Sequence, residues 1–127
     1  MMEYFAFSEF LLRHTENRTF VGLNSCRMAA YFAQQGRCYV TGLSLKEGRR
    51  QLHHRLPVHY GGPDTPENTI LLDIRVHRLV HTADFYEIDY LLEELALADR
   101  QLRVVNQLRL EAHMFIIRQL AEVLRAA

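Results

Sequence analysis

The spacing of apolar residues along the chain predicts a largely helical protein with one extended region. Five segments show helical spacing: residues 3–13, 25–35, 75–81, 85–95 and 99–125. Ser25 and Gly36 are residue types that begin and end the second of these helices. Asp84 followed by Glu87 is typical of a helix start, because both side chains can accept hydrogen bonds from backbone N–H groups there.

The stretch between the second and third helices favours strands and turns. Residues 38–42 read as a short strand and turn, residues 51–60 as a second extended piece, and residues 69–73 as a buried strand. Pro57 interrupts the second strand, and the loop at 61–68 holds two glycines and two prolines. The fold class expected is therefore α+β. It comprises a hairpin leading into the helix at 75–81, a helix before it, and two helices after it, the last one long.

The composition is that of one globular domain. Hydrophobic residues make up 49% of the 127 residues and charged residues 24%, which excludes an intrinsically disordered chain. No run of about 18 apolar residues occurs, so we expect no membrane partner. The start of the chain has acids where a signal peptide needs basic residues, and two cysteines are too few for a disulfide scaffold. These features predict a cytoplasmic protein.

The charges balance overall but are unevenly distributed. The chain has fifteen basic and fifteen acidic residues, and this zero net charge argues against a protein that coats nucleic acid by bulk electrostatics. Residues 27–81 are more basic than the rest of the chain. Five arginines there are candidates for contacts with DNA phosphates, or else form an ordinary solvated face: Arg49, Arg50, Arg55, Arg75 and Arg78.

Histidines provide the candidate chemistry. His77 and His81 are four residues apart, so on a helix they project from one face and can hold one metal ion. His53 and His54 are adjacent on an extended segment, where neighbouring side chains point in opposite directions. One of this pair can complete the metal site while the other deprotonates a water molecule. Asn68 ends the loop, and its amide can bond across the loop backbone.

The histidine pair, the glycine pair at 61–62, Asn68, and the two helix histidines resemble the motif of HNH endonucleases, which have a ββα-metal finger. The resemblance implies that His53, His77 and His81 bind one divalent ion (Mg, Mn, Ni or Zn) and that DNA is the substrate. It also implies that His54 is the general base and that Asn68 belongs to the catalytic site as the loop tether. The domain expected is 1–127, with a finger core at about 38–82 and a helical extension at about 84–127.

A narrower resemblance covers about residues 17–82. The runs YFAQQGRCYVTG, HHRLPVHYGGPDTPENTILL and VHRLVH are similar to the C-terminal endonuclease domain of group II intron-encoded reverse transcriptase/maturases. The resemblance implies nicking of target DNA in intron mobility, with a reverse transcriptase–intron RNA complex as partner. Many relatives carry a four-cysteine zinc site. Here Cys38 remains, but the other three positions are Thr41, Asp73 and Val76, so no such structural zinc is expected.

Two other functions remain open from the sequence. The first is a free-standing HNH nuclease of a phage or a defence system. The second is a catalytically silent module that keeps the finger to bind nucleic acid or protein. The apolar end of the last helix, MFIIRQLAEVL, also suggests a surface on which a second copy docks to form a homodimer.

Overall fold

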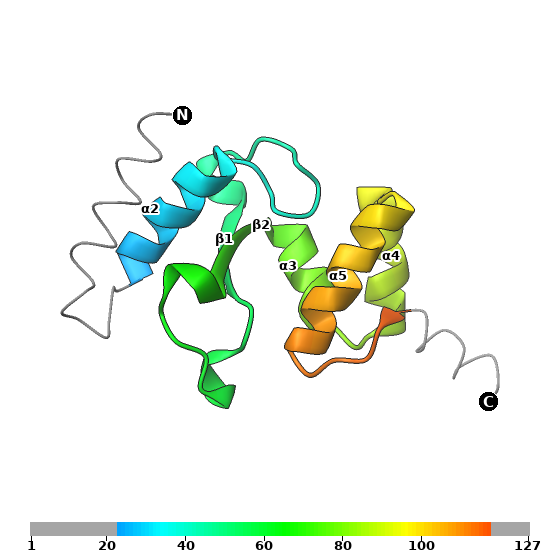
Figure 1. Ribbon diagram of the computed structural model, residues 1–127. Coiled ribbons are helices and arrows are strands. Elements are labelled where there is room, and N and C mark those ends of the chain that lie inside the picture. The colour runs from blue at the N-terminus through cyan, green and yellow to red at the C-terminus, as the bar shows by residue number, and fades with distance from the viewer. Residues whose placement is uncertain (1–22, 118–127) are drawn as a thin grey trace. The chain divides into compact units, whose positions relative to one another are not determined.

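The computed structural model describes residues 23–117, which form an α+β fold with a two-stranded antiparallel sheet and four α-helices (Figure 1). The chain divides into two compact units, the first ending at Asp73 and the second beginning at Ile74. The α+β class expected from the sequence is confirmed. The helix expected at 3–13 lies outside the described residues.

Helix α2 spans Leu23–Gln34 and buries Cys26, Ala29 and Ala30. Ser25 lies inside this helix, so the expectation that it caps the helix is wrong. The helix gives way to a turn in which Gln35 and Gly36 both have positive φ, at 55° and 69°. A glycine in this left-handed conformation is a common way to end a helix.

The sheet consists of β1 (Arg50–His54) and β2 (Thr69–Asp73), paired so that His53 lies opposite Ile70. Every residue of β2 is buried, as its apolar sequence requires, and the expected strand at 69–73 is confirmed. The strand expected at 51–60 is shorter than predicted. It ends at His54, because Pro57 cannot donate to a ladder, and Val58–Tyr60 form a single 3₁₀ turn instead.

Residues 38–42 form a turn, so the turn expected there is confirmed and the short strand is wrong. The Cys38 N–H donates to the Leu43 carbonyl at 2.9 Å, and the Gly42 N–H donates to the Cys38 carbonyl at 2.9 Å. Gly42 has a φ of 71°, which closes the turn before a regular strand can form. One isolated bridge, between Arg37 and Ser44, marks the base of this turn.

The second edge of β2 is covered by a side chain. Gln34 Nε2 donates to the Leu71 carbonyl at 2.9 Å, and its Oε1 accepts from the Leu71 N–H at 2.9 Å. The Tyr39 N–H also donates to the Leu71 carbonyl, at 3.0 Å. The amide of Gln34 therefore supplies the pair of bonds that a third strand would supply at this position.

The second unit consists of α3 (Ile74–His81), α4 (Phe85–Leu95) and α5 (Asp99–Glu111). Both α4 and α5 pack against α3, in which Val76, Leu79 and Val80 are fully buried. The Asp84 side chain accepts from the Tyr86 N–H at 3.0 Å and caps α4 as expected. The helices predicted at 75–81 and 85–95 are thus confirmed.

The long helix predicted over 99–125 is interrupted after Glu111, so one continuous helix is wrong, while residues 118–125 of that prediction lie outside the described part. His113 has a φ of 63°, and the Met114 N–H turns back to donate to the Arg109 carbonyl at 2.7 Å. The apolar spacing continues through the break without a glycine or proline, so the sequence pattern conceals it. The docking surface expected at the end of this helix lies mostly in residues 118–127, outside the described part.

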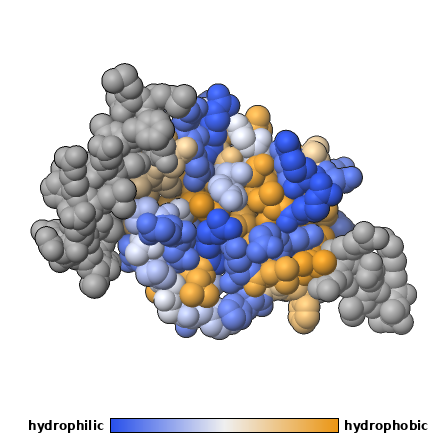
Figure 2. Space-filling model, in the orientation of Figure 1, coloured by the Kyte–Doolittle hydropathy of each residue, from blue (hydrophilic) through white to orange (hydrophobic). Residues whose placement is uncertain are grey.

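On the face shown in Figure 2, hydrophobic residues lie among hydrophilic ones. Within residues 23–117, no helix has both the length and the apolar character needed to cross a membrane.

Candidate metal centre and catalytic histidine

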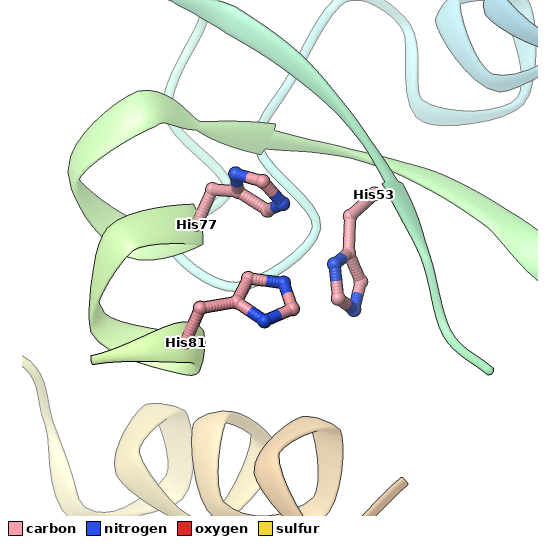
Figure 3. Close-up of side chains that lie close together, drawn as sticks. All are labelled: His53, His77 and His81. Atoms are coloured by element: carbon pink, nitrogen blue, oxygen red, sulfur yellow. The ribbon is translucent and has the colours of Figure 1, made fainter. Parts of the chain in front are cut away.

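Three histidines converge on one point (Figure 3). His53 lies on β1, and His77 and His81 lie one turn apart on α3. Each offers one ring nitrogen, and these three nitrogens all lie within 4.8 Å of one another. A tetrahedral ion about 2.1 Å from each nitrogen would place them roughly 3.4 Å apart, so small side-chain rotations suffice. The three histidines could therefore bind one metal ion.

The local fold explains why these side chains meet. Successive residues of a strand point to opposite faces, and β1 buries His53 with an exposure of 1%. Residues four apart on a helix share a face, and the ring centroids of His77 and His81 lie 4.6 Å apart. Helix α3 begins directly after β2 ends, so hairpin and helix are joined without a loop.

The environment of His77 favours the form that binds metal. Burial, and secondarily the charge that His81 can carry, lower the pKa of His77 to about 4. A protonated imidazole has no free lone pair on either nitrogen, so only the neutral ring is a ligand. His77 is therefore in its metal-binding form at neutral pH.

His54 makes a different contact from that of its neighbour. Its Nε2 lies 2.7 Å from Asp64 Oδ1, and its side chain is 16% exposed. A carboxylate at Nε2 favours the tautomer with the proton on that nitrogen, which leaves Nδ1 as a proton acceptor. Sequence reasoning missed Asp64, because an aspartate in a loop rich in glycine and proline is read as turn chemistry.

Asn68 holds the loop between β1 and β2 closed. Its Oδ1 accepts from the Leu56 N–H at 2.9 Å, and its Nδ2 donates to the Leu56 carbonyl at 3.1 Å. Nδ2 also donates to the Pro63 carbonyl at 3.1 Å. Gly62 lies so close to the Leu56 carbonyl that any Cβ would collide with it. These contacts set the path of the loop that carries Asp64.

An open cleft of about 370 Å³ lies along α3. It is lined by two of the three clustered histidines and by three neighbouring polar residues: His77, His81, Arg78, Thr82 and Glu87. Because the two histidines form its wall, a phosphate in this cleft would lie beside any ion that they hold.

The five candidate phosphate-binding arginines all have partners within the chain. Arg78 donates through Nε and Nη2 to the Glu87 carboxylate at 3.0 and 2.8 Å. Arg75 lies 4.0 Å from a carboxylate oxygen of Glu94. The other three pair as follows: Arg49 with Asp73 at 3.8 Å, Arg50 over the Tyr31 ring at 4.7 Å, and Arg55 over the Tyr39 ring at 5.6 Å. Arg78 is the one that lines the cleft, and its side chain is 68% exposed.

Both cysteines of the chain are free and buried, at Cys26 and Cys38. Cys38 Sγ accepts from the Asp73 N–H at 3.4 Å, which links the 38–42 turn to the end of β2. Burial raises the pKa of the Cys26 thiol, so this residue is a small apolar side chain rather than a reactive group.

Comparisons of the chain with family models, with curated proteins and with solved structures give no match.

Proposed function

We propose that this protein is a metal-dependent DNA endonuclease of the HNH type, which hydrolyses phosphodiester bonds. The observation that carries the proposal is the arrangement of β1. His53 belongs to the three-histidine cluster, while the adjacent His54 is hydrogen-bonded to Asp64. A metal site next to a histidine oriented by a carboxylate suits the hydrolysis of a phosphodiester. The chain order β1, β2, α3 is compatible with a ββα finger.

The three histidines fit a catalytic ion better than a structural one. Three protein ligands leave coordination positions open for substrate and water, whereas structural zinc sites are closed by four. A divalent ion held by His53, His77 and His81 would act as a Lewis acid and offset the charge that develops on the phosphate. Imidazole ligands favour Zn, Ni, Co or Mn over Mg, although the family resemblance allows Mg as well.

His54 serves as the general base in this proposal. Its Nδ1 takes a proton from the attacking water, while Asp64 holds the Nε2–H and faces the positive charge that forms on the ring. The water oxygen bonds to phosphorus, and the bond from phosphorus to the 3′-oxygen breaks. The leaving oxygen takes a proton from solvent, which gives a 5′-phosphate and a 3′-hydroxyl.

The substrate would approach along the cleft on α3. Arg78 is the exposed cation there, and its guanidinium can exchange Glu87 for a phosphate, which also offers two acceptor oxygens for a bidentate contact. The narrower role, nicking of target DNA with a reverse transcriptase–intron RNA partner, is supported by the sequence resemblance over about 17–82. Balanced charge fits targeting by such a partner, because the domain alone attracts DNA weakly.

The test measures the conversion of supercoiled plasmid to open circles. The protein is first treated with a chelator to remove metal, and Mg, Mn, Ni or Zn is then added. We expect metal-dependent nicking by the wild type and a loss of about 100-fold or more in His54→Ala. His59→Ala is the matched control, since His59 is an exposed histidine outside the three-histidine cluster, with its ring 4.3 Å from that of Tyr60.

The outcomes separate the candidate functions. Cutting at one sequence supports an intron-type role, and indiscriminate cutting supports a free-standing nuclease. No nicking with any of the four ions, in the presence of the reverse transcriptase–intron RNA complex as well, would reject the nuclease and favour a silent binding module. Wild-type nicking by His54→Ala would reject His54 as the base.

A further inference from the structure

Arg109 on α5 is the largest fully buried side chain among the described residues, with an exposure of 0%. Burying a guanidinium removes its hydration, which is unfavourable unless hydrogen bonds replace the water. Burial lowers the pKa of Arg109, yet an arginine stays protonated in proteins. Within residues 23–117, no carboxylate pairs with it, so the second unit encloses a positive charge that other groups must satisfy.

Its Nη1 is satisfied by carbonyls at and just after the end of α3, while Nη2 has no hydrogen-bond partner among the described residues. Arg109 Nη1 donates to the carbonyl of Leu79 at 2.8 Å and to that of Thr82 at 2.7 Å, with a longer bond of 3.5 Å to Val80. The last four carbonyls of a helix have no acceptor role within the helix itself. Arg109 therefore caps α3 at the turn that ends in His81.

Helix α3 depends on such support. It has eight residues, which is too short for an isolated helix to be stable in water. Its C-terminal end carries a partial negative charge, and a buried cation stabilises that end more than an exposed one would. The Arg109 Nε also donates to the Phe115 carbonyl at 2.8 Å, so the same side chain ties the segment after α5 to the end of α3.

We propose that Arg109 is a positioning residue for the metal site: it fixes the last turn of α3 so that His77 and His81 face the same ion. The inference rests on the metal site of the proposed function but not on nuclease activity. Its consequence is that a side chain buried in the unit's core, outside the histidine cluster, sets metal affinity.

The experiment measures Co²⁺ binding by the full chain, from the visible absorption of the bound ion, at a temperature where circular dichroism shows each variant folded. We expect Arg109→Met to weaken Co²⁺ binding by about 10-fold or more and to change the absorption spectrum, as losses of supporting contacts do at metal sites. Arg109→Lys keeps the charge but cannot reach the Leu79, Thr82 and Phe115 carbonyls together, so we expect an intermediate affinity. Arg103→Met removes an exposed arginine from the same helix and should bind Co²⁺ as the wild type does.

A folded Arg109→Met with wild-type affinity and spectrum would overturn the inference and leave Arg109 as a core residue only. If Arg109→Met does not fold, the Co²⁺ affinity of Arg109→Lys decides: a reduced affinity supports the inference, and wild-type affinity and spectrum overturn it. A wild type that binds no Co²⁺ would instead reject the three-histidine metal site, and with it the premise of this inference.

Discussion

His53 and His54 are adjacent on β1, yet they have separate surroundings. The alternation of a strand sends one ring to the buried face with the α3 histidines and the other to the loop that carries Asp64. Exchanging the two roles would require a one-residue shift of register, which would move every β1 side chain to the opposite face. The pairing of His53 with Ile70 therefore determines which histidine joins the three-histidine cluster.

At Asp64, we predict that replacing the carboxylate with an amide slows nicking by about 10- to 100-fold without loss of metal binding. The amide oxygen of Asp64→Asn can still accept from His54 Nε2, but it lacks the charge that stabilises the protonated ring. Initial rates of plasmid nicking at saturating metal measure the effect. Glu67→Gln, an exposed acid of the same loop, is the control, and an Asp64→Asn rate equal to that of the control would show that the carboxylate has no role.

At His77, we predict a pH dependence of stability in the metal-free protein. The folded-state pKa is lowered to about 4, whereas an unfolded histidine titrates near 6.5, so only the unfolded chain binds the proton between these values. The free energy of unfolding should therefore fall as the pH falls from about 6.5 to about 4. Urea unfolding in the presence of a chelator should show this fall to be less steep in His77→Gln than in the wild type. Equal slopes in the two proteins would contradict the prediction.

At the scale of elements, sequence patterns located β2, α3 and α4 because each has a strong local cause. The apolar run of β2, the apolar group of α3 and the Asp84 cap are all readable without tertiary contacts. Two of the wrong expectations, the strand at 38–42 and the course of the last helix, depend on hydrogen bonds that a spacing pattern does not display. The turn at 38–42 is closed by the bonds from Cys38 to Leu43 and from Gly42 to Cys38, and α5 ends where the chain returns to bring the Phe115 carbonyl to Arg109.

Gln34 shows how the side chain of a helix residue can complete the hydrogen bonding at a sheet edge. Gln34→Ala would leave the Leu71 N–H without its partner at a buried strand edge, which we expect to lower the free energy of unfolding by about 1–3 kcal/mol. Chemical denaturation measures the change. Gln35→Ala is the matched control for a neighbouring exposed amide. A Gln34→Ala variant as stable as the wild type would mean that water replaces the amide at no cost.

At the scale of the whole molecule, the sequence marked the histidines and Asn68 but neither Asp64 nor Arg109. The histidines were visible because their spacing is characteristic of metal ligands on a strand and a helix. Asp64 acts across ten positions of irregular loop, where no periodicity exists. Arg109 does share the buried face of α5 with Val105, Leu108 and Ala112, at helical spacing. This placement could have marked Arg109 in the sequence, because a charged residue on an apolar helix face needs buried hydrogen-bond partners.

A metal ion held by the three histidines should also stabilise the folded chain, because these histidines come from two elements that are distant in sequence. An ion that binds the folded state alone stabilises it by about 2.7 kcal/mol at 100 times its Kd, which corresponds to a rise of roughly 10 °C in Tm for a domain of this size. We expect excess Zn²⁺ to raise the Tm of the chelator-treated protein by this order, and a chelator to reverse the rise. His53→Ala removes the ligand from β1 and should lose most of the shift, while His59→Ala should keep it. An equal shift in both variants would show that Zn²⁺ binds elsewhere, and His53 would then have no place in the metal site.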